Sequence, residues 1–322
     1  MKAKEHLVYF ILLLSLSTIK AADVLGINQR VYLPGDVKEN LLLYSEEDEN
    51  LVFMPNSSFF ESGLAQTVYN DLPNFYMALL KNKGKIQPDQ KNYKRDENGA
   101  IIRINPEERN IYLVFTADSL FEGIDPVYEI LKEHQIAGSF FFTGNFLRNR
   151  EHKKVIKKII KEGHYVGPHS DKHQLYCDRR NKDSTLITFE EFKTDLENNY
   201  KELEKYGIHK DEATFFMPPY EWYNSEIVNW CRKLALDVVN FTPGTGTDAD
   251  ITTPEMDNYK SSEEIWSNLK IFEEYQPEHL NGAILLIHLG TSTNRKDKFY
   301  HLLDEIIEYC YTNGYRFSSL KN

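Results

Sequence analysis

The feature that most constrains the fold of this 322-residue chain is a regular alternation of two apolar patterns that begins near residue 108. Seven short β-prone runs are separated by segments with the spacing of amphipathic helices. Such alternation predicts parallel strands covered by helices, and seven units that close on themselves would form a distorted (β/α)₇ TIM-like barrel. An open, doubly wound sheet is the competing fold, but no glycine-rich nucleotide-binding motif follows the first predicted strand. The predicted strands are 112–116, 139–143, 164–167, 214–217, 237–241, 283–289 and 315–317.

Capping signals mark the starts of several predicted helices. Thr188 with Glu191, and Ser261 with Glu264, have the spacing of a capping box, in which two side chains satisfy two N–H groups at a helix start. Asp125 precedes a proline and predicts an N-cap, with the proline at the first helical position.

The first 21 residues have the pattern of a secretory signal peptide. Basic residues precede an apolar run at 7–19, and Ala21 and Ala22 provide the small residues of a cleavage site. An uncleaved anchor or a buried helix is the alternative, although the run is shorter than the about 20 residues of a membrane span. We therefore expect a signal peptide at 1–21, an N-terminal extension or small subdomain at 22–107, and the barrel at 108–322. A secreted or periplasmic protein without a stable membrane anchor is expected, since no lipid-attachment cysteine lies near residue 20.

Charge and cysteine content exclude several classes of protein. The net charge is −11, and it becomes about −13 after cleavage, which argues against nonspecific binding of nucleic acid. Cys177, Cys231 and Cys310 form no CxxC pair, so a cysteine-rich zinc or redox site is not expected. One disulfide with a free thiol, or three free thiols, fit the sequence equally well.

Polar residues follow several predicted strands at the point where each strand ends. Asp118 follows the first strand, His169 and His173 follow the third, Glu221 follows the fourth, and His288 ends the sixth. Because functional residues of parallel α/β barrels gather at the carboxyl ends of strands, these side chains are expected on one face.

His169 and His173 are spaced so that one helical turn would bring both imidazoles to one cation. A carboxylate such as Asp118 would complete a three-ligand set for zinc or a similar metal. The structural alternatives are a loop or N-cap role for Asp118 and a core position for His288, which follows four aliphatic residues.

The segment from about 110 to 317 resembles the polysaccharide deacetylases of carbohydrate esterase family 4, the chitooligosaccharide-deacetylase-like proteins. The residues at 112–119 stand where that family has a TFDDG-like motif, and His169–His173 is its HSxxH motif, intact. The residues at 218–220 occupy its RxPY-like motif, and 286–288 match its LxH motif.

The resemblance implies a fold, a substrate and roles for single residues. Asp118, His169 and His173 would hold a divalent metal, Zn²⁺ first and Co²⁺, Ni²⁺ or Mn²⁺ as alternatives. His288 would act as general acid, and the backbone N–H of Tyr220 would help to hold the oxyanion. The substrate would be an acetylated carbohydrate.

This sequence departs from the family at three positions. Ala117 stands where the family has its catalytic-base aspartate, and Met217 stands where an arginine pairs with that aspartate. Thr242 lies near the place of the aspartate that tunes the catalytic histidine. Loss of both the aspartate and its arginine agrees with simple electrostatics, because the charge of either one left alone would lack a partner of opposite charge.

A replacement base, catalysis without a protein base, and binding without turnover are therefore all open. Glu221 and Asp171 are the candidates for a replacement base, although Glu221 could equally be a solvent-facing acid. Trp222 and Tyr223 could stack on a sugar ring or serve as packing. We expect a secreted, metal-dependent deacetylase that removes N- or O-linked acetyl groups from a carbohydrate. A non-catalytic carbohydrate-binding descendant and a metal-dependent amidohydrolase on small amides are the alternatives.

Overall fold

The computed structural model describes residues 41–45, 51–55 and 92–321. The chain divides into two compact units, Met1–Asn92 and Tyr93–Asn322. In the first unit, β1 (Leu41–Ser45) pairs antiparallel with β2 (Leu51–Pro55). The expected signal peptide at 1–21 and most of the expected extension lie outside the described residues. Among the described helices, none combines the length and apolar character that a membrane span requires.

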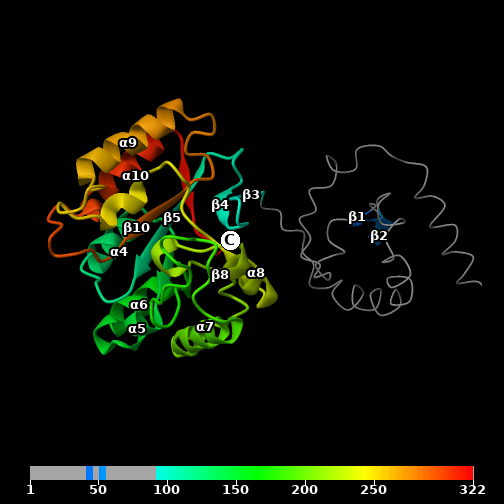
Figure 1. Ribbon diagram of the computed structural model, residues 1–322. Helices are drawn as coiled ribbons and strands as arrows, with labels where there is room; N and C mark the ends of the chain where they lie inside the picture. The colour runs from blue at the N-terminus through cyan, green and yellow to red at the C-terminus, as the bar shows by residue number, and fades with distance from the viewer. Residues whose placement is uncertain (1–40, 46–50, 56–91, 322) are drawn as a thin grey trace, which may run out of the picture. The chain divides into compact units, whose positions relative to one another are not determined.

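All seven predicted strands are present in the second unit, and the predicted fold class is confirmed. Strands β10, β5, β6 and β7 lie side by side in that order and are parallel, and β8 pairs parallel with β9. Figure 1 shows helices arranged around these central strands. The strands are β5 (Asn110–Ala117), β6 (Ser139–Phe142), β7 (Tyr165–Pro168), β8 (Phe215–Phe216), β9 (Asp237–Val238), β10 (Ile284–His288) and β11 (Arg316–Ser318).

The ring of strands closes with a strand from outside the expected barrel boundary. The hairpin of β3 (Tyr93–Arg95) and β4 (Ile101–Ile104) belongs to the second unit, so this unit begins before residue 108. Within it, Ile101 bridges to Val239 after β9, and Arg103 bridges to Ala283 before β10. Strand β4 therefore fills the gap between β9 and β10.

The barrel is irregular at two further places. Strand β11 pairs with the first half of β5, on residues 110–112, whereas β6 pairs with residues 114–117. Between β7 and β8, the Tyr165 hydroxyl donates to the Phe215 carbonyl and accepts from the Phe215 N–H. A side chain thus replaces part of the missing backbone ladder.

Two of the three predicted helix starts are confirmed. Both capping boxes are present at α7 and α9. Asp125 is not an N-cap: α4 begins at Ile124 after Gly123, because the Val127 N–H already donates to the Gly123 carbonyl. The helices are α4 (Ile124–Glu133), α5 (Gly144–Arg148), α6 (Lys153–Lys161), α7 (Phe189–Glu204), α8 (Ser225–Lys233), α9 (Ser262–Tyr275) and α10 (Leu303–Thr312). Short 3-10 turns are η2 (Arg150–His152), η3 (Pro219–Glu221), η4 (Thr247–Ile251) and η5 (Phe299–Leu302).

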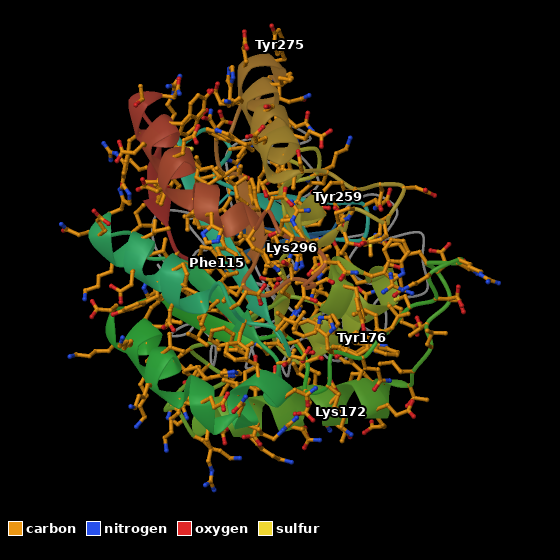
Figure 2. All side chains as sticks on the ribbon, turned by 90° about the vertical axis from the view of Figure 1, so that its left-hand side faces the viewer. Phe115, Lys172, Tyr176, Tyr259, Tyr275 and Lys296 are labelled. Carbon is orange, nitrogen blue, oxygen red and sulfur yellow. The ribbon has the colours of Figure 1, made fainter. Side chains whose placement is uncertain are left out.

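Apolar residues cover both faces of the sheet. Along β5, Leu113 and Phe115 pack in the larger cluster with the helices, while Tyr112 and Val114 pack in a smaller cluster that includes Leu286 of β10. In Figure 2, Phe115 lies in the interior, whereas Tyr275 projects from the end of α9. The cysteines Cys177, Cys231 and Cys310 are buried and free, which matches the expectation of three thiols rather than that of a disulfide.

Candidate active site

Asp118 lies directly after β5 and is held by the start of α5. Its Oδ1 accepts hydrogen bonds from the Thr143 hydroxyl at 2.8 Å and from Asn145 Nδ2 at 3.5 Å. Thr143 is also the N-cap of α5, since its Oγ1 accepts from the Phe146 N–H. The carboxylate of Asp118 is therefore fixed at the carboxyl edge of the sheet.

His169 follows β7 and is almost completely buried, at 1% exposure. Its Nδ1 lies 2.7 Å from the Met217 carbonyl, which can only accept, so Nδ1 carries the proton. Its backbone N–H donates to Asn199 of α7. Burial, together with His173, keeps the pKa of His169 well below the usual histidine value. The neutral ring presents the lone pair of Nε2 to its surroundings.

A tight loop, rather than the helical turn considered from the sequence, brings the two histidines together. Ser170 and His173 have φ angles of 70° and 55°, in the left-handed region that non-glycine residues rarely occupy. The Ser170 hydroxyl accepts a hydrogen bond from the His173 N–H at 2.8 Å. As a result, the Nε2 atoms of His169 and His173 lie 3.2 Å apart.

This pair of imidazoles has the spacing of two ligands on one ion. Two nitrogens at about 2.0–2.1 Å from a tetrahedral zinc would lie about 3.3 Å from each other. The bond from His169 Nδ1 to a carbonyl is the usual support of a metal-ligating histidine. Within residues 92–321, however, no group of three His, Cys, Asp or Glu side chains is arranged to hold a metal. The structure thus provides two donors in ligand spacing, with Asp118 hydrogen-bonded to Thr143.

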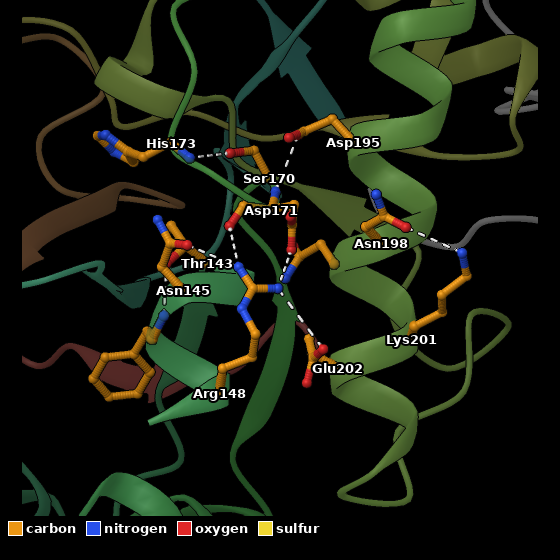
Figure 3. A network of polar contacts seen from close by, with 12 residues as sticks. Thr143, Asn145, Arg148, Ser170, Asp171, His173, Asp195, Asn198, Lys201 and Glu202 are labelled. Atoms are coloured by element: carbon orange, nitrogen blue, oxygen red, sulfur yellow. Dashed lines mark hydrogen bonds and ion pairs between the residues drawn. The ribbon is translucent and has the colours of Figure 1, made fainter. Parts of the chain in front are cut away.

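The loop that carries the histidines is supported from behind by α5 and α7 (Figure 3). Asp195 accepts the Asp171 N–H at 3.0 Å and the Tyr176 hydroxyl at 2.7 Å through one oxygen. Burial raises the pKa of Asp195. The Asp171 side chain bonds Arg148 at 2.6 Å, so this candidate base is committed to an ion pair.

The segment after β8 turns sharply and delivers Glu221 to His288. Tyr220 and Glu221 have φ angles of 60° and 53°, two strained residues in succession. This turn places Glu221 Oε2 at 3.9 Å from His288 Nε2. The Tyr220 ring packs against His173, with the centroids 4.4 Å apart.

His288 is held on both sides by carboxylates. Asp250 of η4 lies 2.6 Å from its Nδ1 and accepts its backbone N–H through the other oxygen. Burial opposes protonation of His288, but Asp250, Glu221 and Asp248 outweigh it and raise its pKa to about 9. Burial is also the main cause that raises the pKa of Glu221 to about 7. His288 is therefore not the apolar-core histidine of the alternative interpretation.

Sequence reasoning missed Asp250 and looked for a carboxylate near Thr242. The Thr242 hydroxyl instead donates to the Ile102 carbonyl and accepts the Ile284 N–H, so it joins β4 to β10. The two aspartates at 248 and 250 were the available signal in the sequence. Asp250 lies eight residues beyond Thr242 in the sequence. The chain turns at Gly246, before η4, and so brings Asp250 to His288.

Two predicted sugar-stacking residues are used in packing. Tyr223 is 1% exposed, and its hydroxyl donates to Asp96, so its ring is not available for stacking and that expectation is corrected. Trp222 is half-buried and donates its indole N–H to the Asp178 carbonyl. Ala117 and Met217 are both buried, so the two departures from the family lie in apolar surroundings.

Comparisons with known proteins identify relatives of this chain. The model of the polysaccharide deacetylase family matches residues 103–239. Peptidoglycan-N-acetylmuramic acid deacetylase PdaA of Bacillus subtilis is 26% identical over 218 residues, which cover 67% of this chain and 72% of the relative. Chitooligosaccharide deacetylase of Azorhizobium caulinodans is 25% identical over 193 residues, or 60% of this chain and 79% of the relative.

Solved structures share the fold. BA3943 of Bacillus anthracis, described as a CE4 family pseudoenzyme, has a TM-score of 0.53 at 19% identity. The match covers 70% of this chain and 68% of the BA3943 chain. PdaA of Bacillus subtilis, a family 4 carbohydrate esterase, has a TM-score of 0.51 at 22% identity and covers 71% and 93%. Together these matches show a polysaccharide deacetylase domain at residues 103–239 and a fold shared with the two solved structures.

Proposed function

We propose that this protein is a secreted, metal-dependent deacetylase that hydrolyses N- or O-linked acetyl groups on a carbohydrate polymer or oligosaccharide. The observation that carries the proposal is the position of His288 between Asp250 and Glu221. The named deacetylases among the relatives support the substrate class. The sequence pattern at 1–21 supports secretion.

Asp118, His169 and His173 would hold the divalent cation, with Zn²⁺ as the first choice for imidazole and carboxylate donors. When bound, the cation would polarise the acetyl carbonyl and lower the pKa of water. His169 contributes a neutral Nε2 whose orientation is fixed by the Met217 carbonyl. The backbone N–H of Tyr220 remains the proposed donor to the oxyanion.

His288 is suited to the role of general acid. With a pKa of about 9, the ring is protonated at neutral pH, and Asp250 holds the Nδ1 proton. The Nε2 proton is then available to an amine or alkoxide as it leaves. The side chains of His288 and Glu221 are each only 13% exposed, which limits the screening of this electrostatic arrangement by water.

Glu221 is suited to the role of the missing base. Its pKa of about 7 lies near the pH at which a general base both is ionised and accepts a proton effectively. Ala117 cannot supply a carboxylate, and Asp171 is bonded to Arg148. Glu221 also lies 3.9 Å from His288 Nε2, whereas Asp250 bonds the other ring nitrogen.

The test is release of acetate from chitooligosaccharide, acetylated xylan and peptidoglycan, with the protein stripped of metal and then given Zn²⁺. The proposal expects activity that returns with metal and disappears in His288→Ala. Bound metal is measured in parallel by elemental analysis, and it should remain in His288→Ala but fall in His173→Ala. An active protein without bound metal would contradict metal dependence.

A non-catalytic carbohydrate-binding protein is the second candidate. Ala117 and Met217 favour it, because the usual base and its arginine are both absent. A family member described as a pseudoenzyme shares the fold, and a mutant of that protein is described as having restored enzymatic activity. Binding of acetylated glycan without acetate release, at any metal content, would favour this candidate over the enzyme.

A further inference from the structure

A basic loop borders the proposed active site. We define it as residues 172–183, which carry four cations and two acids, so 4 − 2 gives a net charge of +2 in a chain of −11. The cations are Lys172, Arg179, Arg180 and Lys182. The loop is closed by backbone contacts: Cys177 bridges to Thr185, and the Asp178 N–H donates to the Ser184 carbonyl. The backbone that carries Arg179, Arg180 and Lys182 is therefore closed at its base.

Arg179 connects the basic loop to the site through an aromatic ring. Its guanidinium carbon lies 4.8 Å from the centroid of the Tyr220 ring. The same ring lies 4.4 Å from the imidazole of His173. Arg179 is exposed, and Tyr220 is 41% exposed, so both can be reached from solvent. One aromatic ring thus separates the guanidinium from the proposed metal ligand.

The cations of the basic loop are not neutralised by neighbouring acids. Within residues 92–321, no salt bridge joins a carboxylate to Lys172, Arg179, Arg180 or Lys182. By contrast, Arg148 pairs with Asp171 and Glu202, and Lys298 pairs with Glu122. The Asp178 carboxylate accepts backbone N–H groups of its own loop. A guanidinium that lies on a ring keeps its outer N–H groups free for a planar, bidentate acceptor such as a carboxylate.

The opposite side of the site carries the opposite charge. Glu221, Asp248 and Asp250 surround His288. An anionic group would be repelled there and attracted to Arg179, so the charges of the site impose one orientation on an acidic substrate. A neutral glycan would gain nothing from this arrangement.

We propose that the basic loop is a subsite for a carboxylate-bearing sugar, and that the substrate is an acetylated acidic glycan. The inference rests on the proposed function only in assuming that the acetylated sugar lies beside His173. Arg179, with Arg180 nearby in the chain, binds the carboxylate of a neighbouring sugar. The acetyl group then points toward His288.

Binding tests this subsite without requiring turnover. In a His288→Ala background, the dissociation constant is measured for an oligosaccharide that alternates N-acetylglucosamine with N-acetylmuramic acid, whose lactyl carboxylates are free. Tetra-N-acetylchitotetraose is the neutral comparison. We expect the acidic glycan to bind about tenfold more tightly than the neutral one. Arg179→Gln should weaken binding of the acidic glycan about five- to tenfold, the size of effect expected for one solvent-exposed hydrogen bond.

The control is Arg316→Gln, an exposed arginine on β11 beside the first residues of β5, at the end of that strand opposite Asp118. It should leave both dissociation constants unchanged. Equal affinity for the two glycans, or equal effects of Arg179→Gln on both, would overturn the inference while leaving deacetylation intact. Acetate release by the wild-type protein is measured separately. Its absence, with the acidic preference retained, would contradict the proposed function and leave the subsite standing.

Discussion

Asp250 Oδ1 lies 2.6 Å from His288 Nδ1, and Asp250 Oδ2 accepts the backbone N–H of the same residue at 2.9 Å. Both oxygens of one buried carboxylate thus bind one histidine, which fixes its ring plane and its tautomer. The far nitrogen, Nε2, then faces Glu221 at 3.9 Å. This relationship gives the proposed general acid, His288, a defined orientation.

Asp250→Asn should lower the pKa of His288, because the strongest of the carboxylates that favour its protonation becomes neutral. We expect turnover to fall by about 10²-fold, within the range for loss of general acid catalysis, with bound metal unchanged. The measurement is acetate release together with titration of His288 by NMR. A histidine pKa that stays near 9 in the variant would contradict this account.

The activity should follow a bell-shaped pH profile with its maximum between about 7 and 9. The rising limb reports ionisation of the base, and the falling limb reports loss of the proton from the acid; as the two groups interact, these are values of the pair. In Glu221→Gln the rising limb near 7 should disappear. A rising limb that persists in the variant would assign it to another group.

The pH dependence of stability has a defined sign. The folded pKa of His288, about 9, lies above the usual value of 6.5, so folding favours the protonated ring. Its stabilising contribution is complete below about 6.5 and is lost as the pH rises through 9. The difference between the denaturation midpoints at pH 6 and pH 9.5 should therefore be smaller in Asp250→Asn than in the wild-type protein. An unchanged difference between the two midpoints would exclude His288 as its source.

The strands and most of the helices could be predicted because each depends on local pattern. Alternating apolar residues and capping boxes such as Thr188 with Glu191 act over a few residues, and the structure retains them. Strand β4 could not be placed, because its bridges join Ile101 to Val239 and Arg103 to Ala283, contacts of long sequence separation. The same reason explains why the boundary at 108 falls inside the unit that begins at Tyr93.

The residues of the candidate site could be predicted from the sequence, but the contacts between them could not. Strand ends indicated Asp118, His169, His173 and His288, and the spacing of the histidines indicated a shared ligand. The left-handed Ser170, Tyr220 and Glu221 that aim these groups have no sequence signal, because non-glycine residues adopt this region only when tertiary contacts impose it. Burial of Tyr223 was equally invisible, as its hydroxyl partner Asp96 is distant in sequence.

Glu221→Gln should reduce turnover by about 10²-fold or more while leaving the fold intact, because glutamine keeps the shape but cannot accept a proton at neutral pH. Asp171→Asn is the matched comparison, an acid-to-amide change at the other candidate base. It weakens the ion pair with Arg148 and should affect turnover by less than about threefold. Acetate release by both variants decides between them, and the reverse ranking would transfer the role to Asp171.

Asp195→Leu should destabilise the loop that carries the two histidines. One carboxylate oxygen accepts both the Asp171 N–H and the Tyr176 hydroxyl, and leucine would leave these buried donors without partners, at about 1–3 kcal/mol each. We expect a lower melting temperature and, because His169 and His173 flank Asp171, weaker binding of zinc. Thr194→Leu, an exposed position next to it on α7, is the control and should change neither. If zinc affinity survives when the melting temperature falls, the carboxylate of Asp195 stabilises α7 and its neighbours but does not position the ligands.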